Sequence, residues 1–261
     1  MVAELTPSAA RANEFCQQTG FAYRFDWGPN GLRTLAPLAE VVIVVDVLRF
    51  TSAVSAAIES GCIVFPYRWA DEGAADHAAQ HDAVLAGFRE HGGPSLSPTD
   101  LLSLRPGTKL LLPSPNGATL TATARERSVA PILAGCLRNA SATARRAAAL
   151  AGGGPIAVIA SGELTAAGSV RFAVEDLLGA GAVLRGLDPA GSVSGARCSP
   201  DAAAARAAFV AARPLLHEHL LESPSGRELT TIGFADDIHT SAAYDVTDLA
   251  ALLVDGEFTA V

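Results

Sequence analysis

Residues 41–52 read VVIVVDVLRFTS, and this stretch decides the fold. Its first five residues are all β-branched, which is typical of a strand buried on both faces of a parallel sheet. Asp46, Arg49 and the hydroxyl pair Thr51-Ser52 follow, and either hydroxyl can cap a helix. Ligands of open α/β sheets bind beyond the carboxyl ends of the strands. Asp46 and Arg49 are therefore candidate functional residues.

Asp46 needs a partner at the end of this apolar strand, because a desolvated and unpaired carboxylate is very costly in free energy. A metal ion, an arginine or backbone N–H groups can supply one. The functional interpretation places Asp46 and Arg49 in a ligand site. The structural alternative is an ion pair between the two that only fixes the turn from strand to helix, and this segment alone leaves both open.

Strand-like runs alternate with helix-like runs along the chain, which favours a doubly wound α/β fold. The apolar runs predict core strands at 41–46, 62–66, 83–87, 109–113, 131–135 and 155–160. Helices are expected at 51–60, 118–127, 139–151 and 169–187. For the first helix, Thr51 or Ser52 is the expected cap and Gly61 the expected stop.

The last quarter of the chain has a different pattern. Residues 199–222 predict one or two helices divided near Pro214, followed by a Pro/Ser/Gly turn at 223–226. Asp255-Gly256 lies between two short apolar runs, which predicts a β-hairpin. We interpret residues 1–261 as a single domain, with 188–200 as the candidate point of subdivision.

Composition limits the classes of partner. The net charge of −8 and the pI near 5.2 argue against a nucleic-acid surface, which needs clustered basic residues. No apolar run reaches the roughly 18 residues of a membrane span, and the first twenty residues do not resemble a signal peptide, so we expect a cytoplasmic protein. Small molecules are the expected partners. The four cysteines have no metal-ligand spacing, and Lys109 is the one lysine.

Three further predicted strands end in polar, flexible sequences. Residues 114–119 read SPNGAT, and Asn116 and Gly117 there can expose backbone amides at a helix start, which makes a candidate anion cradle. Residues 136–141 read CLRNAS, and residues 161–163 read SGE. Each sequence alone also fits ordinary helix capping. Together with Asp46, the four strand ends predict a shared pocket.

These segments, taken in order, resemble the 2-phosphosulfolactate phosphatase (ComB-like) family of coenzyme M biosynthesis. The resemblance lies in VVIVVDVLRFTSAVSAAIESG (41–61), LLLPSPNGATL (110–120), ILAGCLRNASATA (132–144) and SVRFAVEDLLGAGAVL (169–184), with a weaker similarity in the DDI and VDG segments of the tail. It implies a three-layer α/β/α fold with a largely parallel or mixed sheet. It also implies a magnesium-dependent phosphatase that acts on a small sulfonated phospho-acid.

The resemblance also assigns residues. Asp46 and Arg49 match the family's Asp-Val-Leu-Arg motif and are the expected catalytic pair. Oxygen ligands suit Mg²⁺, and the expected metal ligands are Asp46, Glu175 and Asp176, although an exposed acidic patch at a helix start is the alternative for the last two. Asp46 is either the nucleophile or a ligand of the metal that activates water. The expected substrate-binding residues are Asn116, Gly117, Asn139, Arg89 and Arg171.

Departures from the family pattern concern the rim of the site. The family's Gly-Asn-Ser-Pro element reads Ser95-Leu96-Ser97-Pro98 here, so Leu96 replaces a polar side chain. Cys136 replaces the usual serine of its loop. Rim groups choose among small anions, so these changes leave the exact substrate open.

Two other functions are compatible with a small-ligand α/β protein. The first is noncatalytic binding of a small anion or a nucleotide, which the loss of a polar rim residue at Leu96 favours. The second is dinucleotide-dependent oxidoreduction. No strand is followed by the GxGxxG pattern that the oxidoreductase requires. His77 and His81 have a spacing that can bind zinc, but no third ligand is indicated. The apolar surplus makes a homodimer a reasonable hypothesis.

Overall fold

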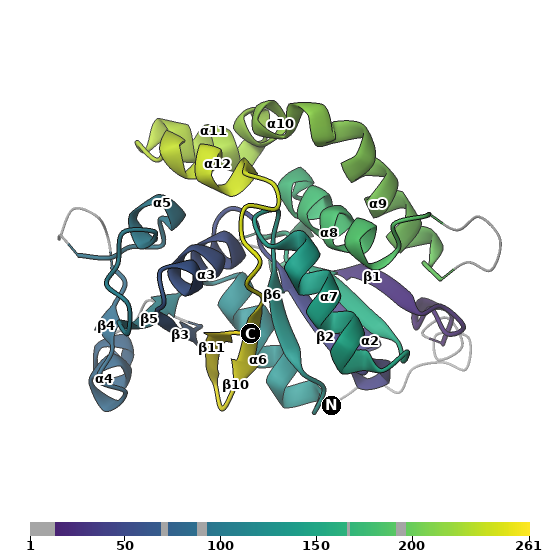
Figure 1. Ribbon diagram of the computed structural model, residues 1–261, viewed down its shortest axis with the longest axis horizontal. Helices are drawn as coiled ribbons and strands as arrows, with labels where there is room; N and C mark the ends of the chain where they lie inside the picture. Colours follow the sequence, from purple (N-terminus) through teal and green to yellow (C-terminus); the bar gives the residue numbers. More distant parts are fainter. Residues whose placement is uncertain (1–13, 69–72, 88–92, 166–167, 192–196) are drawn as a thin grey trace.

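The structure is a computed structural model that describes residues 14–68, 73–87, 93–165, 168–191 and 197–261. The described chain is built around a nine-stranded mixed sheet with helices on both faces, which confirms the expected three-layer α/β/α fold (Figure 1). In spatial order the strands are β1 (Tyr23–Trp27), β7 (Ile156–Ala160), β2 (Val41–Val45), β6 (Ile132–Gly135), β10 (Ala251–Val254), β11 (Glu257–Ala260), β3 (Ile63–Tyr67), β5 (Lys109–Pro113) and β4 (Val84–Leu85).

Helices form the outer layers. α2 and α6 pack on one face of the β1–β7–β2–β6 half of the sheet, and α7 and α8 pack on the other, with α9 against the outside of α8. The helices are α2 (Gly28–Leu35), η1 (Ala36–Leu38), α3 (Phe50–Glu59), α4 (Gly73–Gln80), α5 (Pro98–Leu101), α6 (Gly117–Arg127), α7 (Ala140–Ala151), α8 (Val174–Leu187), α9 (Pro200–Ala212), η3 (Arg213–Leu215), α10 (Leu216–Glu222), α11 (Pro224–Thr231) and α12 (Ala235–Ala242).

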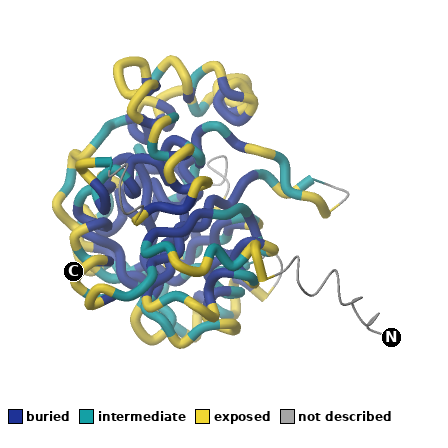
Figure 2. The backbone as a smooth tube through the Cα atoms, turned by 90° about the vertical axis from the view of Figure 1, so that its right-hand side faces the viewer, coloured by how far each residue is buried: buried dark blue, intermediate teal, exposed yellow. Residues whose placement is uncertain are grey.

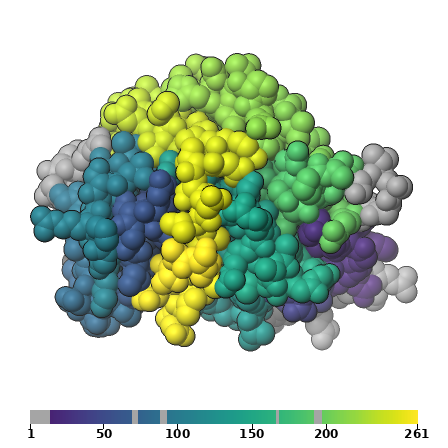
Figure 3. All heavy atoms as spheres, in the orientation of Figure 1, coloured from purple at the N-terminus to yellow at the C-terminus, as the bar shows by residue number. Residues whose placement is uncertain are grey.

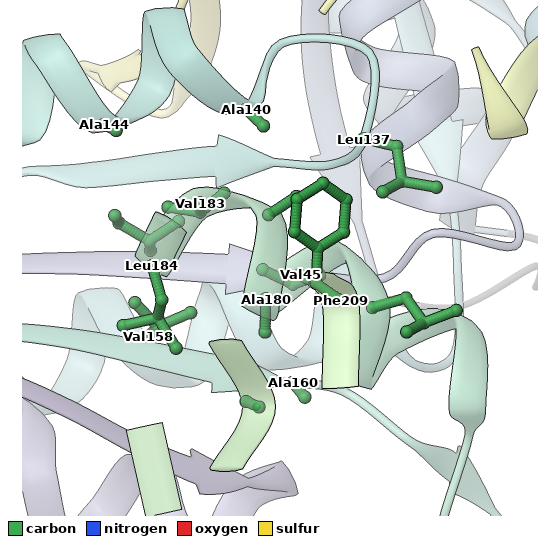
Figure 4. Packing of buried hydrophobic residues seen from close by; sticks show 14 of the residues in the cluster. Val45, Leu137, Ala140, Ala144, Val158, Ala160, Ala180, Val183, Leu184 and Phe209 are labelled. Carbon is green, nitrogen blue, oxygen red and sulfur yellow. The ribbon is translucent and has the colours of Figure 1, made fainter. Parts of the chain in front are cut away.

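The β2 strand is buried on both faces, as its five β-branched residues predict. Val41, Ile43 and Val45 pack into the core cluster that includes α7, α8 and α9, whereas Val42 and Val44 pack against α2 and α6. Figure 4 shows Val45 among side chains of this first cluster. Because successive strand residues point to opposite faces, a fully apolar strand suits a central position between two helical layers.

The sheet consists of two parallel groups joined by a hairpin. β1, β7, β2 and β6 pair in parallel, and so do β3, β5 and β4. The antiparallel β10–β11 hairpin, with Asp255-Gly256 at its tip as predicted, pairs with β6 on one side and β3 on the other. In Figure 3 these C-terminal residues, in yellow, lie between the two groups.

Twist of the sheet brings strand ends of the two groups together. Three antiparallel pairings separate the groups, so β5 runs opposite to β2 along the ladder. Neighbouring strands rotate by roughly 20–25°, and over the five pairings from β2 to β5 this adds up to roughly 100–125°. The carboxyl end of β5 is thereby turned toward that of β2, and Gly117 after β5 meets Asp46 after β2.

The structure corrects two elements predicted from the sequence. The helix expected at 169–187 begins only at Val174, because Val170–Arg171 forms β9 and pairs with β8 (Glu163–Leu164). The turn expected at 223–226 is the start of α11, where the Ser223 hydroxyl accepts the N–H of Gly226 at 3.0 Å. β1, α2, α4, α5 and α12 were not predicted. The other predicted core strands and helices agree with the structure to within two residues at each end.

Buried residues lie in the interior, where the apolar ones form separate clusters, and exposed residues lie at the periphery (Figure 2). Strands from both ends of the described chain belong to the same sheet. The single domain, with 188–200 as its candidate point of subdivision, stays a prediction, and residues 192–196 of that stretch lie outside the described ranges. Within those ranges, no helix is both long and apolar enough to cross a membrane.

Candidate active site

Asp46 directly follows β2, and its side chain is buried, with 5% of the residue exposed. Thr51 fixes the main chain at this point: the Asp46 N–H donates to Thr51 Oγ1 at 3.0 Å, and that hydroxyl donates to the Asp46 carbonyl at 2.8 Å. The N-cap of α3 is Arg49, so the expectation that Thr51 or Ser52 caps this helix is wrong. Thr51 instead holds the turn that presents Asp46.

Backbone amides surround the Asp46 carboxylate. The Phe50 N–H donates to Oδ1 at 3.3 Å, and the N–H of Gly117 also donates to the carboxylate. Gly117 is the first residue of α6, so the positive end of that helix lies against Asp46. A Cβ at Gly117 would lie 2.7 Å from Asp46 Oδ2 and would collide with the Phe50 ring. Only glycine allows this approach of the helix to the carboxylate.

Other acids lie close to Asp46. Burial raises the pKa of Asp46 to about 7, and the negative charges of Glu163 and Glu175 contribute to this increase, whereas the Phe50 and Gly117 amides oppose it. Glu163 was not predicted as a site residue. It begins β8 three residues after the end of β7, and its place in the Ser-Gly-Glu strand end was the signal that pointed to it. Asp46 thus belongs to a cluster of carboxylates.

Asp176 lies beside Asp46, as the sequence predicts. Its two oxygens accept backbone N–H groups from Val47 at 2.7 Å and from Gly162 at 2.9 Å, so the first turn of α8 is joined to the ends of β2 and β7. Burial raises the pKa of Asp176 well above its ordinary value, and the charges of Asp46 and Glu175 raise it further. Asp176 therefore connects the strand ends in addition to adding negative charge.

Glu175 has a different environment, although it is the neighbour of Asp176. Adjacent helical residues point about 100° apart, so the two side chains diverge. Glu175 is 2% exposed, and its Oε2 has no hydrogen-bond partner in the described part of the chain. The expectation of an exposed acidic patch on this turn is thus excluded, since both acids are buried.

The described residues contain no group of three or more His, Cys, Asp or Glu side chains placed to hold a metal ion. His77 and His81 also lack a third ligand within the described ranges, and their rings are tilted by 53° to each other with centroids 4.7 Å apart.

Arg49 does not pair with Asp46. Its Nη1 forms a 2.8 Å ion pair with Oδ2 of Asp237 in α12, and its guanidinium carbon lies 4.4 Å from the centre of the Phe234 ring. The structural alternative of an Asp46–Arg49 ion pair is therefore wrong. Asp237 was not predicted as a site residue, and the acidic DDI segment of the tail was the only signal for it.

Asn116 and Asn139 use their amide groups within the protein. Asn116 donates to Glu163 Oε1 at 3.0 Å and accepts the N–H of Leu164 at 3.3 Å, which ties the β8–β9 hairpin to the start of α6. Asn139 is fully buried, accepts the Cys136 N–H at 2.9 Å and donates to the Ala134 carbonyl at 3.1 Å. Both side chains order loops at the site, and their contact with substrate stays a prediction.

Of the two arginines predicted to bind substrate, Arg171 is described by the structure and Arg89 is not. Arg171 lies on β9, where its Nη1 donates to the Phe172 carbonyl at 3.2 Å and its Nη2 to the Ser225 hydroxyl at 3.4 Å. Arg89 lies outside the described residues. Leu96, which departs from the family pattern, packs against the core cluster that includes α3.

Two surface hollows lie apart from this cluster. One of about 680 Å³ borders α2, and one of about 580 Å³ borders the connection from α6 to β6. Asp46 and Glu175 line neither of them. We locate the site by the convergence of buried charged groups on one strand end, because ionisable groups with shifted pKa values cluster at functional sites.

A family model for 2-phosphosulpholactate phosphatase matches residues 30–256 of the chain. The chain belongs to this family. A curated relative, the 2-phosphosulfolactate phosphatase of Methanothermobacter thermautotrophicus, is 28% identical over 220 residues, which cover 82% of this chain and 87% of the relative. The resemblance inferred from the sequence motifs is confirmed. By family, this 2-phosphosulfolactate phosphatase homologue is a phosphoric monoester hydrolase.

Proposed function

We propose that the protein is a magnesium-dependent phosphatase that hydrolyses the phosphate ester of a small anionic phospho-acid resembling 2-phosphosulfolactate. The observation that carries the proposal is the environment of Asp46, a buried strand-end carboxylate that meets the N-terminus of α6 and is surrounded by further acids. Family membership supplies the reaction class. With 2-phosphosulfolactate itself as substrate, the reaction would belong to coenzyme M biosynthesis.

The chemistry of the carboxylates fits a divalent cation. Glu175 Oε2 is buried without a partner among the described residues, and burial beside other acids raises the pKa of Asp46. A cation would relieve both, because an unpaired buried charge is costly. Mg²⁺ prefers oxygen ligands and commonly keeps several waters, so few protein ligands suffice. We assign Asp46 and Glu175 as the residues that would hold it, with Asp176 beside them. When bound, Mg²⁺ would neutralise phosphoryl charge as a Lewis acid.

The remaining groups would bind and orient the substrate. Arg49 offers a guanidinium to the phosphoryl oxygens, and the amides at the start of α6 add donors, which is the charge stabilisation that phosphoryl transfer needs. Asp46 has two compatible roles, attack on phosphorus or retention of the cation, and both require its carboxylate. Arg171, at the hairpin beside the site, and Arg89 are proposed to bind the second anionic group of the substrate.

A noncatalytic anion-binding protein is the competing function. The sequence feature that supported this function was Leu96, which stands where the family has a polar residue. In the structure Leu96 packs against the hydrophobic core, so an apolar side chain at this position is explained by packing. No feature of the described residues favours this function over hydrolysis.

The test is release of inorganic phosphate from a panel of phosphorylated small acids: 2-phosphosulfolactate, 2-phosphoglycolate, 3-phosphoglycerate and phosphoenolpyruvate. We expect turnover of at least one compound with MgCl₂, none with excess EDTA, and none for Asp46→Asn under either condition. Ser60→Ala, which removes the hydroxyl of the C-cap residue of α3 that is bonded to the Ala56 and Leu101 carbonyls, is the matched control and should retain activity. Turnover that persists in EDTA would refute the magnesium dependence. Turnover that persists in Asp46→Asn would refute the site.

A further inference from the structure

Arg49 is held on two sides by residues of the C-terminal helices. Its Nη1 pairs with Asp237 Oδ2 at 2.8 Å, and the Phe234 ring lies 4.4 Å from its guanidinium carbon. The other oxygen of Asp237 accepts a hydrogen bond from the Ser97 hydroxyl at the start of α5. Asp237 lies 188 residues after Arg49, and its carboxylate joins α12 to both the β2–α3 turn and the start of α5.

The pair is asymmetric in its exposure. The side chain of Asp237 is 1% exposed, whereas that of Arg49 is 15% exposed. Within the described ranges, Nη1 is the one guanidinium nitrogen of Arg49 with a protein hydrogen bond. A guanidinium has five N–H donors in a rigid plane, so fixing one edge also fixes the direction of the others. Arg49 thus has a bound edge toward α12 and an open edge.

The ion pair between Arg49 and Asp237 is not an ordinary solvent-exposed ion pair. Exposed ion pairs are weak because water screens them, but Asp237 is almost fully removed from water and is satisfied by Ser97 and Arg49. The aromatic face of Phe234 restricts the guanidinium from a further direction. These contacts select one orientation of Arg49, three residues after Asp46.

We propose that Asp237 is a positioning residue, which orients Arg49 so that the open edge of its guanidinium receives the phosphoryl oxygens of the substrate. The proposal rests on the proposed function, because it assigns the phosphoryl group to Arg49. It adds that α12 is part of the active site through Asp237. It also predicts that charge at position 237, rather than shape, determines how well Arg49 binds an oxyanion.

The test is a double-mutant cycle with Arg49→Gln, Asp237→Asn and the double variant, with Ser97→Ala as the control that removes the other contact to Asp237. Binding of inorganic phosphate is measured by calorimetry, and kcat and KM are measured on the substrate found active. The variants are compared at a temperature where circular dichroism shows each to be folded. Asp237→Glu tests rescue by a carboxylate on a longer side chain.

We expect Asp237→Asn to weaken phosphate binding and to raise KM by roughly 10- to 100-fold, the value of one charge-assisted hydrogen bond. Asp237→Glu should recover part of this loss, and Ser97→Ala should change KM less than Asp237→Asn does. In the Arg49→Gln background, Asp237→Asn should have no further effect on phosphate affinity or KM. Independent, multiplying losses from the two substitutions would overturn the positioning role, and so would equal effects of Ser97→Ala and Asp237→Asn.

Phosphate binding separates this proposal from the proposed function. If the wild type binds phosphate in an Asp237-dependent way but hydrolyses no ester, the phosphatase proposal fails and the positioning role stands. If the wild type hydrolyses an ester and the cycle shows independent effects, the positioning role alone fails.

Discussion

The backbone N–H of Val47 donates a 2.7 Å hydrogen bond to Oδ1 of Asp176, 129 residues further along the chain. This bond attaches the first turn of α8 to the residue after Asp46. The second oxygen of Asp176 accepts the Gly162 N–H at 2.9 Å, and Gly162 follows β7. One side chain therefore sets the relative position of two strand ends and a helix, whereas its neighbour Glu175 makes no comparable bond with Oε2 among the described residues.

Glu175→Gln and Asp176→Asn should consequently separate cation binding from stability. Asp176→Asn turns an NH₂ group toward a backbone N–H, and leaving such a buried donor unsatisfied costs about 1–3 kcal/mol of unfolding free energy. Glu175→Gln removes a buried charge without breaking a bond to Oε2, so stability in EDTA should not fall. The measurement is urea denaturation of both variants in EDTA, followed by the rise in melting temperature on adding MgCl₂.

Saturating Mg²⁺ stabilises the folded state by about 2.7 kcal/mol at 100 times its dissociation constant. The wild type should show an increase in melting temperature of a few degrees, and Glu175→Gln should lose most of it. An unchanged magnesium response in Glu175→Gln would remove this residue from the cation site.

The pH dependence of stability in metal-free protein should follow Asp46. Burial raises its pKa in the folded state to about 7, against an ordinary value of about 3.9 in the unfolded chain. Between these two values the folded state binds more protons than the unfolded state, so stability decreases as pH rises through the window. Denaturation in EDTA from pH 4 to 9 should show this decrease, and Asp46→Asn should reduce it.

In EDTA, the stability of Asp46→Asn relative to the wild type should therefore increase as pH rises from 4 to 8, because only the wild type acquires the buried charge of Asp46. Asp176 also has a raised pKa, so part of the pH dependence should remain in the variant. Equal slopes of stability against pH in the two proteins would show that Asp46 is not the buried acid that titrates in this window.

Gly117→Ala should impair the site, because the new Cβ would lie 2.7 Å from Asp46 Oδ2 and would collide with Phe50. Either α6 or Asp46 must then move. Overpacking of this kind costs about 1–3 kcal/mol, and we expect a larger proportional loss of kcat than of stability. Gly87→Ala is the control, since a Cβ there has no heavy atom within 4 Å. Activity of Gly117→Ala equal to that of Gly87→Ala would contradict the close approach of α6 to Asp46.

Local sequence patterns were sufficient for most of the central layer. The β-branched run before Asp46 predicts β2, and Asp255-Gly256 predicts the β10–β11 hairpin, because both signals lie within a few residues of the element they specify. The proximity of Asp46 to Asp176 was also predicted, through two motifs of one family. The spacing of apolar residues along a strand or helix indicates which side faces the core. In this protein most of the central strands and helices are buried on such an apolar side, so the spacing predicts them correctly.

The remaining features depend on contacts between distant residues. Val170 and Arg171 lie in a sequence compatible with helix, but they form β9 because β8 is available to pair with them. The insertion of β10–β11 between β6 and β3 cannot be read from the order of elements. Asp237 and Glu163 each became site residues only through a partner far away in the chain, Arg49 and Asn116 respectively.

The link between Asn116 and Glu163 gives a last prediction. Asn116 donates to Glu163 Oε1 at 3.0 Å and accepts the Leu164 N–H at 3.3 Å, so its amide holds the β8–β9 hairpin to the start of α6 and keeps Glu163 near Asp46. Asn116→Ala removes both bonds at a partly exposed position, where two hydrogen bonds contribute about 1–3 kcal/mol in all. We expect a modest loss of stability and a clear loss of kcat/KM.

Asn116→Asp should be worse for activity than Asn116→Ala, because it places a second negative charge against Glu163 instead of a donor. Hydrogen exchange of the Leu164 amide should accelerate in both variants, since each weakens the attachment of the hairpin. Thr123→Ala is the control on the same helix, because among the described residues its hydroxyl bonds only to the Thr119 carbonyl at 2.8 Å, within α6 itself. If Asn116→Ala retains wild-type kcat/KM while exchange at Leu164 increases, the attachment of the hairpin has no part in catalysis, and Glu163 does not need to be held near Asp46.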